Sequence, residues 1–326
     1  MKYLNLKLKK LSKLKNNYYK IRIITKIIIT FFLIKLINRY IYINKLKICI
    51  CTLGKDENLY IREFVEYYKK YNVDKIFLYD NNDINGERFE EVIYDYLNKG
   101  FVKIKNWRGK ENAMFQIMNH CYQTNYLKFD WLIFYEIDEY IFLKNYTNIK
   151  TFLSEKKFNK CEVIYLNWVH YTDNNLMHYD NRTLEKRFTE KEPNARKKNS
   201  KISAVTKFIL KGHIPKIKIS SVHVLSRKLK GCNGFGKIIT INDLKGNRLY
   251  HPDFEYFYIK HFFCKSVEEF ITKINKGCAI YGQNENYKKK RIKKYFRYNK
   301  ITSLKINYIE NKTKINLSEY RNIYLK

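Results

Sequence analysis

The fold is decided between residues 46 and 80, where the sequence reads LKICICTLGKDENLYIREFVEYYKKYNVDKIFLYD. Residues 46–53 form a short apolar run that predicts a strand. Across residues 57–71 the apolar side chains recur at near-helical spacing, with Asp56 as a candidate N-cap, which predicts a helix. Residues 75–79 predict a second strand. A strand, a helix and a strand in this order indicate a βαβ unit with parallel strands.

The same alternation continues toward the C-terminus. It predicts strands at residues 101–107, 131–135, 163–168, 204–210 and 220–225, and helices at residues 88–97, 111–126 and 267–277. No internal repeat interrupts this pattern. We therefore expect one α/β domain over residues 46–285, a basic C-terminal extension over residues 286–326, and a separate N-terminal segment over residues 1–45.

The N-terminal segment combines a basic flank with an apolar stretch. Seven lysines fall within the first twenty residues: Lys2, Lys7, Lys9, Lys10, Lys13, Lys15 and Lys20. Residues 21–43 follow, but Lys26 and Lys35 leave only residues 27–34 as an uninterrupted apolar run, shorter than the ~20 residues that span a bilayer. A single-pass type II anchor and a membrane-surface or packed helix both remain open. We expect membrane association, with a cytoplasmic protein as the alternative.

Composition excludes several classes of protein. The chain has 326 residues, 45% of them hydrophobic, with only three Pro and eleven Gly, which indicates a folded globular protein. Its formal net charge of +34 would attract nucleic acid, anionic lipid or phosphorylated substrates. Lys, Asn, Ile and Tyr are over-used together, as an AT-rich coding sequence would produce, so the charge alone assigns no partner. The seven cysteines contain no CxxC pair, which excludes a zinc ribbon and leaves disulfides undecided.

Candidate binding residues stand where the predicted strands end, because ligands of open parallel sheets bind at the carboxyl ends of the strands. These residues are Thr52, Asp80, Arg108, Glu136 and Asp138. A dinucleotide-binding loop would place several glycines directly after the first strand, and this chain has one glycine there. A phosphorylated ligand would need positive charge from another source, and a metal ion is the obvious candidate.

The sequence Glu136-Ile137-Asp138-Glu139 follows a fully apolar strand that would hold its carboxylates rigidly. Hard oxygen ligands suit Mg²⁺ or Mn²⁺, which often complete their coordination with substrate phosphates. Acidic residues after a strand also occur as plain turns, and that alternative stays open. A second acidic residue at the same expected edge of the sheet, Asp80, favours the metal site.

A series of segments in fixed order resembles glycosyltransferase family 92 and its relatives with a GT-A fold. They are residues 55–64 and 73–81, Gly100-Phe101-Val102 before Trp107, Gln116 with Cys121, Trp131 before residues 137–140, residues 185–188, Val222-His223, residues 261–270, and finally Lys273 and Gly277. The resemblance covers residues 47–277. It implies a single GT-A-like, Rossmann-like α/β domain with a mixed, mainly parallel central sheet.

The resemblance also implies a metal-dependent transfer of a sugar from a UDP-sugar, typically UDP-galactose, with inversion. The family's D-x-D motif falls on Glu136-Ile137-Asp138, with Glu in place of the first Asp. Asp138 is then the expected ligand of Mn²⁺ or Mg²⁺, Glu136 contributes to the metal site or faces the ribose, and His261 completes the metal site.

The remaining expected roles concern the donor, the catalytic base and the acceptor. The donor is expected to contact Thr52, Glu57, Asp80, Arg108, Glu136 and Lys265. An inverting transfer needs a carboxylate to accept the proton of the acceptor hydroxyl, and four candidates stay unresolved. They are Glu268, Glu269, Asp173 and Glu185. The acceptor is expected to be a glycan, a glycolipid or a glycoprotein.

Two other functions compete with this interpretation. The first is a basic module that binds nucleic acid or anionic membrane and whose transferase site has decayed. A binder of polyanions gains nothing from carboxylates clustered at one sheet edge, so nucleic acid is not an expected partner. The second is another nucleotide-dependent enzyme such as a nucleotidyltransferase, which would share the metal carboxylates but does not predict residues 261–270.

Overall fold

The structure is a computed structural model that describes residues 17–193, 203–225, 228–277 and 285–325. It divides into two compact units, Met1–Leu46 and Lys47–Lys326. In the first unit the helix α2 (Asn17–Lys45) exposes large apolar side chains along most of its length. Within the described residues, no helix combines the length and apolar character that crossing a membrane requires. Apart from Lys20, the lysines of the expected basic flank lie outside the described residues.

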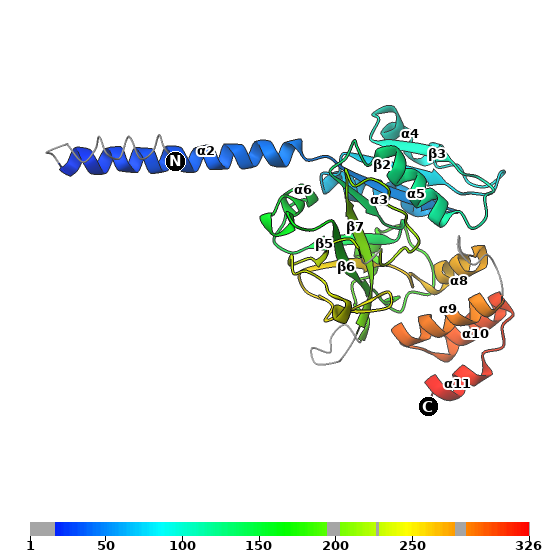
Figure 1. Ribbon diagram of the computed structural model, residues 1–326. Coiled ribbons are helices and arrows are strands. Elements are labelled where there is room, and N and C mark those ends of the chain that lie inside the picture. Colours follow the sequence, from blue (N-terminus) through cyan, green and yellow to red (C-terminus); the bar gives the residue numbers. More distant parts are fainter. Residues whose placement is uncertain (1–16, 194–202, 226–227, 278–284, 326) are drawn as a thin grey trace. The chain divides into compact units, whose positions relative to one another are not determined.

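The second unit is built on one mixed sheet (Figure 1). In its described part the main path runs β3-β2-β1-β4-β7-β6-β11-β5, with β8, β9 and β10 paired beside it. The strands are β1 (Ile48–Gly54), β2 (Lys75–Asp80), β3 (Val102–Asn106), β4 (Trp131–Phe134), β5 (Glu139–Leu143), β6 (Val163–His170), β7 (Ser203–Lys211), β8 (Gly231–Asn233), β9 (Leu244–Lys245), β10 (Arg248–Tyr250) and β11 (Phe257–His261).

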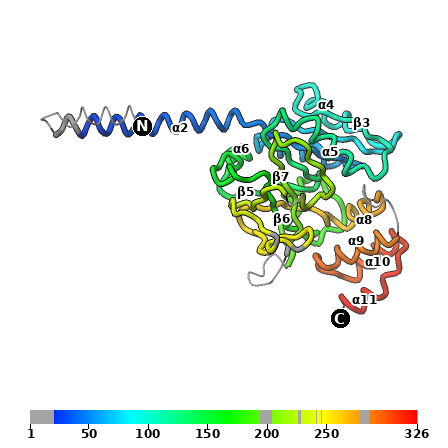
Figure 2. The backbone as a smooth tube through the Cα atoms, in the orientation of Figure 1, coloured from blue at the N-terminus to red at the C-terminus, as the bar shows by residue number. Residues whose placement is uncertain are grey.

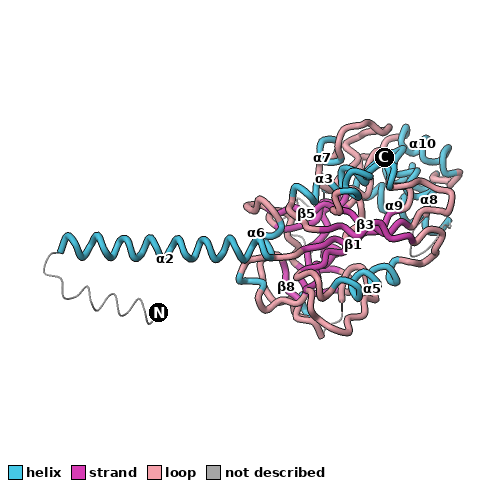
Figure 3. Tube along the Cα trace, turned by 90° about the horizontal axis from the view of Figure 1, so that it is seen from above, coloured by secondary structure: helices cyan, strands magenta, loops and turns pink. Residues whose placement is uncertain are grey.

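Helices cover both faces of this sheet, and α3 and α5 lie on opposite sides of the strands (Figure 3). The described helices of the second unit are α3 (Asn58–Lys70), α4 (Glu90–Asn98), α5 (Met114–Asn125), α6 (Ile149–Leu153), α7 (Leu184–Arg187), α8 (Val267–Lys276), α9 (Glu285–Tyr298), α10 (Ser303–Thr313) and α11 (Ser318–Tyr324). Helices on both faces explain why β1, β4 and β6 are almost continuously apolar. The predicted α/β domain with a mixed, mainly parallel sheet is confirmed.

The direction of the strands brings distant chain segments to one edge. Strand β1 pairs in parallel with β2 and β4, and β6 pairs in parallel with β11. Because β7 is antiparallel to both β4 and β6, these two sets of strands point the same way. Strand β5 runs antiparallel to β11 and therefore begins at the edge where the others end. The carboxyl ends that the sequence analysis singled out thus share one edge.

The C-terminal helices pack around α8 (Figure 2). Helix α8 begins with a capping box, in which the Ser266 hydroxyl accepts from the Glu269 amide and the Glu269 carboxylate accepts from the Ser266 amide. Its apolar side chains join those of α9 and α10 in one cluster that includes Phe270, Tyr295 and Ile306. Residues 286–325, expected as a basic extension, therefore contribute to the packing of the second unit.

Two local predictions were wrong. Residues 220–225 are not a strand, because the Ser221 hydroxyl accepts from the amides of His223 and Val224 and turns the chain. Asp56 is not the N-cap of α3. Its backbone has a φ of 51°, and Glu57 occupies the N-cap position without a side-chain hydrogen bond.

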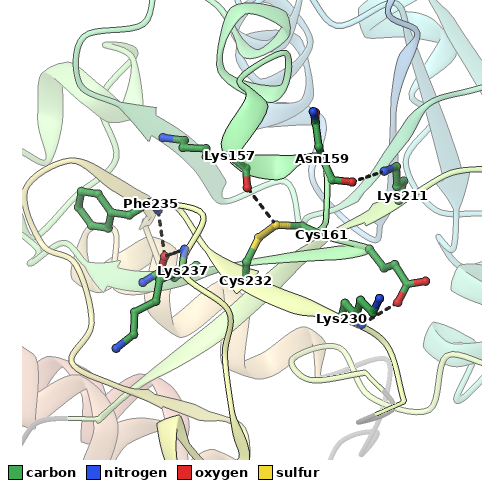
Figure 4. The surroundings of a disulfide bond; sticks show 10 residues. Lys157, Asn159, Cys161, Lys211, Lys230, Cys232, Phe235 and Lys237 are labelled. Carbon is green, nitrogen blue, oxygen red and sulfur yellow. Dashed lines mark hydrogen bonds between the residues drawn. A yellow bond between two sulfur atoms is a disulfide. The ribbon is translucent and has the colours of Figure 1, made fainter.

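A disulfide joins Cys161 to Cys232, with their Cα atoms 5.9 Å apart (Figure 4). It links the chain just before β6 to β8. Neighbouring hydrogen bonds hold both sides: the Lys230 amide donates to the Glu162 carboxylate at 2.7 Å, and the Lys237 amide donates to the Asn233 side chain at 3.1 Å. Among the described cysteines the other four are free and buried.

Candidate functional site

A cavity of about 120 Å³ opens at the carboxyl edge of the parallel strands. The ends of β1, β2 and β4 form one side, and α8 and α9 form the other. The lining residues are Leu53, Lys55, Glu57, Asn81, Met114, Glu136, Ile137, Asp138, Lys273, Lys276, Gly277, Tyr287 and Arg291. We call this cavity the cleft. Position 54, next to the cleft, requires glycine, because a Cβ there would lie 2.6 Å from the Phe89 side chain and 2.8 Å from the Ile137 side chain.

Asp138 stands in the tight turn between β4 and β5, where its carbonyl accepts a 3.0 Å hydrogen bond from the Phe262 amide. Its buried carboxylate contacts the Lys273 ammonium, and its Oδ2 lies 3.4 Å from Nε2 of His261. Burial disfavours the ionised carboxylate, but the Lys273 and His261 side chains outweigh it and hold the pKa of Asp138 well below its usual range. Asp138 is therefore an anion at neutral pH.

His261 ends β11 and pairs in register with Glu139 of β5 and His170 of β6. Burial lowers the pKa of His261 to about 4, although the Asp138 carboxylate opposes the shift. The imidazole is thus neutral at neutral pH and keeps a nitrogen lone pair. In the described part of the chain, its buried Nδ1 has no hydrogen-bond partner.

A second cluster lies beside Asp138 and is centred on Lys207 of β7. The Lys207 Nζ is 2.7 Å from Oε1 of Glu136 and 3.3 Å from Oε1 of Glu139. Burial opposes ionisation of Glu136, yet Lys207 lowers its pKa to about 2. Burial raises the pKa of Glu139 to about 8 despite the same lysine. Lys207 therefore pairs with an ionised Glu136, while Glu139 is protonated at neutral pH.

A third cluster surrounds Glu57, at the start of α3. The Lys276 ammonium contacts its carboxylate and also donates to the carbonyls of Lys55 at 2.6 Å and Asp56 at 3.2 Å. Lys265 lies 3.6 Å from the same carboxylate and 3.1 Å from the centroid of the Tyr60 ring. Burial lowers the pKa of Lys265 to about 8. Lys276 of α8 and Lys265, just before α8, thus both hold the segment between β1 and α3.

The donor set of the cleft fits a divalent cation in part. A carboxylate and a neutral imidazole nitrogen, from Asp138 and His261, face each other closely enough to share one ion, and substrate phosphates would supply further ligands. The Glu136 carboxylate also lines the cleft, and it pairs with Lys207 at 2.7 Å as Asp138 pairs with Lys273. Within the described residues, no group of three or more His, Cys, Asp or Glu side chains could hold a metal ion. In the described part of the chain, Asp138 and His261 are therefore a pair of candidate ligands rather than a complete metal site.

Three other expected donor residues lie near the cleft but do not line it. Asp80 ends β2 and forms a buried ion pair with Arg108, Oδ2 to Nε 2.8 Å. Arg108 also donates to the carbonyl of Asp83 at 2.7 Å, so this pair fastens the loop after β2. Thr52 faces a smaller cavity of about 10 Å³ that Glu136 and Lys207 also line.

The four candidate bases lie away from the cleft, and each has a partner. Glu269 binds Arg187 at 2.7 Å and belongs to the capping box of α8. Glu185 contacts Lys260, and Asp173 binds Lys305 at 2.6 Å. Glu268 is exposed and accepts from the Tyr179 amide at 2.9 Å.

Sequence reasoning missed several residues of the site, above all Lys207, Lys273, Lys276 and Arg291. Lys273 and Lys276 carried a readable signal, because their spacing of three places them on one face of the predicted helix. Lys207 carried none: it sits at the middle of a strand predicted only from its apolar neighbours.

Aromatic and imidazole rings extend from His261 away from the cleft. Its ring centroid lies 4.3 Å from Trp168 and 4.8 Å from His170, and His170 stacks on Tyr298 at 4.5 Å. Burial lowers the pKa of His170 well below its usual range. In the described residues, Trp168 Nε1 and His170 Nδ1 are buried without hydrogen-bond partners.

The sequence model of glycosyltransferase family 92 matches residues 44–317. A family 92 protein of Ricinus communis is 28% identical over 103 residues, which cover 30% of this chain and 17% of that protein. One of Oryza sativa subsp. japonica is 27% identical over 96 residues, covering 28% of this chain and 16% of that protein. The chain thus matches less than a fifth of the length of these relatives.

The sequence identity to solved structures is lower than to these relatives. TarS of S. aureus, residues 1–349, is 12% identical, with a TM-score of 0.35 over 77% of this chain and 70% of that chain. The same protein in complex with UDP has a TM-score of 0.30 at 14% identity, over 38% of this chain and 36% of that chain.

Proposed function

Because the chain belongs to glycosyltransferase family 92, we propose that it transfers a sugar from a nucleoside diphosphate sugar to an acceptor hydroxyl. The proposed donor is a UDP-sugar, and UDP-galactose is the first candidate. The proposed acceptor is a glycan, a glycolipid or a glycoprotein. The observation that carries the proposal is the cleft: an ionised Asp138 and basic side chains of α8 and α9 face one cavity at the edge where α/β sheets bind ligands. A neutral His261 lies 3.4 Å from the Asp138 carboxylate.

The charges of the cleft suit a departing nucleoside diphosphate. Negative charge accumulates on the leaving phosphate as the glycosidic bond breaks, and fixed cationic groups stabilise that charge. Lys273, Lys276 and Arg291 supply such groups from one wall. Asp138 and His261 would hold Mn²⁺ or Mg²⁺, which when bound would act as a Lewis acid on the diphosphate oxygens.

The proposed stereochemistry is inversion in a single displacement. Such a transfer needs the acceptor on the face of the sugar opposite the leaving diphosphate. The ring cluster of Trp168, His170 and Tyr298 adjoins His261, and its apolar ring faces would serve to bind a carbohydrate acceptor. Buried indole and imidazole nitrogens without partners in the described residues would hydrogen-bond sugar hydroxyls.

The proposal is tested by calorimetric titration of UDP, UDP-galactose and UDP-glucose into the full chain with Mn²⁺, followed by product assays with those donors that bind. We expect UDP to bind, and Asp138→Asn to abolish the dependence of binding on Mn²⁺. Asp95→Asn serves as the matched control, because Asp95 of α4 pairs with Arg62 of α3 and does not line the cleft.

Absence of UDP binding by the folded wild-type protein with Mn²⁺ present would overturn the proposal. Salt-sensitive binding of an oligonucleotide or of anionic vesicles, unchanged by Asp138→Asn, would then favour the basic binding module.

We also propose that α2 brings the protein to a membrane surface. Its exposed isoleucine, leucine and phenylalanine side chains, interspersed with Lys26, Lys35 and Arg39, combine apolar area with positive charge. Vesicle flotation of the full chain and of residues 45–326 tests this. Only the full chain should float with anionic vesicles, and equal recovery of both would exclude a role for α2.

A further inference from the structure

Two lysines of α8 reach the cleft, and they differ in how their ammonium groups are satisfied. Lys276 contacts Glu57 and two backbone carbonyls, so its hydrogen-bonding capacity is filled. Among the described residues, the hydrogen-bond acceptor of Lys273 is Asp138. An ammonium group can donate several hydrogen bonds, so Lys273 keeps unused donors at the wall of the cleft.

Contacts of other residues of α8 fix the backbone from which Lys273 projects. The capping box at Ser266 fixes the start of α8, and the buried pair of Glu269 with Arg187 fastens its first turn. Phe270 and Ile274 anchor the helix in the apolar cluster. The flexible stem of Lys273 therefore projects from a rigid helix, and its ammonium can change partner without moving the backbone.

The partner of Lys273 is also the expected metal ligand. Both the Lys273 ammonium and Nε2 of His261 approach the same oxygen of Asp138, Oδ2. A divalent cation between Asp138 and His261 would bind that oxygen too, and two cations on one oxygen repel each other strongly in a buried site. Without either cation, Asp138 would be a buried unpaired carboxylate, which is costly.

We propose that Lys273 is the phosphate-binding residue of the cleft and that it shares Asp138 with the divalent cation. In the empty cleft its ammonium neutralises Asp138. When a cation binds Asp138 and His261, the ammonium turns to the donor diphosphate, an anion that its unused donors can reach inside the same cavity. This inference rests on the proposed function, because it takes a nucleoside diphosphate as the ligand.

A consequence is that the cation and the diphosphate bind cooperatively. The cation must displace an ammonium from Asp138 to bind alone, whereas a bound diphosphate attracts that ammonium away and adds ligands for the cation. Each ligand should therefore tighten the other by the same factor.

The experiment measures free Mn²⁺ by electron paramagnetic resonance during titration of the protein, with and without saturating UDP, and measures UDP binding in EDTA by calorimetry. For the wild type we expect UDP to tighten Mn²⁺ binding by about tenfold or more. For Lys273→Met we expect Mn²⁺ alone to bind about tenfold more tightly than to the wild type, and UDP in EDTA to bind about tenfold more weakly.

Two further variants keep the test decisive. Lys289→Met removes an exposed lysine of α9 and should match the wild type in all titrations. Lys273→Arg retains the charge and should keep UDP binding in EDTA within a few-fold of the wild type, so it reports on the charge if Lys273→Met folds poorly.

The outcomes separate the two proposals. A wild-type protein that binds no UDP overturns the proposed function and this inference together. A wild type that binds UDP, with a folded Lys273→Met variant whose UDP affinity is unchanged, overturns only the phosphate-binding role of Lys273. A folded Lys273→Met variant with unchanged affinity for Mn²⁺ alone overturns the sharing of Asp138.

Discussion

Two buried aspartate–lysine pairs in the same unit have the same chemistry but different surroundings. Asp173 and Lys305 have side chains only 2% and 3% exposed, and the Lys305 ammonium also donates to Asn175 at 3.3 Å and to the Lys300 carbonyl at 2.8 Å. In the pair of Asp138 with Lys273, the aspartate is 5% exposed but the lysine is 17% exposed and borders the cleft.

The difference lies in what else could bind each charge. Around Asp173, Tyr295 donates to the carboxylate and the Asn175 amide donates at 2.8 Å, so the protein satisfies both partners. Around Asp138, the other neighbouring side chain is the neutral His261. The Lys273 ammonium keeps N–H donors that face the cleft and are available to a ligand there. Closed networks stabilise a fold, whereas an open pair at a cavity leaves binding capacity for a ligand.

The largest expected effect on stability comes from breaking the closed pair, Asp173 with Lys305. Lys305→Met should lower the free energy of unfolding by about 3–5 kcal/mol, because it leaves Asp173 as a buried, uncompensated charge. Urea denaturation followed by circular dichroism measures this. UDP binding by the folded fraction should equal that of the wild type. A loss of stability below about 1 kcal/mol would show that the pair is not closed as described.

Breaking the open pair of Asp138 with Lys273 should have the opposite result, a large loss of activity with a small loss of stability. Asp138→Asn should slow sugar transfer by about two to three orders of magnitude, or roughly 3–4 kcal/mol of transition-state stabilisation, because an anionic ligand of the cation is lost. Its free energy of unfolding should change far less than that of Lys305→Met, since Lys273 can turn toward the cleft. Single-turnover rates and denaturation curves are the measurements. An unchanged rate would place the cation elsewhere.

A third comparison uses acid titration of a half-buried, neutral histidine, His223. Burial lowers the pKa of His223 to about 4, and its Nδ1 lies 2.8 Å from the Thr206 carbonyl. Between this value and the ordinary histidine pKa, the unfolded chain binds more protons than the folded one, so stability falls as the pH falls. From pH 7.5 to pH 5 His223 should cost about 2 kcal/mol of unfolding free energy.

His223→Gln is the variant for this test, and its unfolding free energy should depend less on pH than that of the wild type over the same range. Parallel slopes for the two proteins would mean that the pKa of His223 is the same in the folded and unfolded states.

The smallest effect is expected from an exposed pair on α9. Glu285 and Lys289 lie one helical turn apart, with Oε1 and Nζ separated by 2.6 Å and both side chains at least half exposed. Glu285→Gln should leave the midpoint of urea denaturation unchanged within error, because solvent screens such pairs. A clear shift of the midpoint would show that the short distance between Glu285 and Lys289 stabilises the fold even though both side chains are exposed.

Much of the fold could be predicted because its signals are local. The apolar runs that became β1, β2 and β4 sit in a sheet covered on both faces, so burial forced their composition. The helix predicted over residues 267–277 is α8, which Ser266 and Glu269 cap by hydrogen bonds within one turn. Residues 220–225 failed because side-chain hydrogen bonds of Ser221 turn a chain whose apolar pattern resembles a strand.

The candidate site was predictable only in part. Asp138 and His261 stood out through the family resemblance, and the structure brings them together. The carboxylates expected as bases could not be separated by sequence, and the structure shows each with another partner. A carboxylate that is free in sequence is not free in the fold, because its partner is chosen by packing.

The sequence by itself determined the order of strands and helices, the acidic turn after β4 and the family to which the chain belongs. These are properties of neighbouring residues, where spacing, propensity and burial act within a few positions. Only the tertiary structure decided which lysine neutralises which carboxylate: Lys207 meets Glu136 across 71 positions, and Lys273 meets Asp138 across 135. The helical spacing of Lys273 and Lys276 was visible in the sequence, but no local pattern marked Lys207 or showed which carboxylate either Lys207 or Lys273 would meet. Their role follows from the strand directions and from the placement of α8, which set the distances on which electrostatic energy depends.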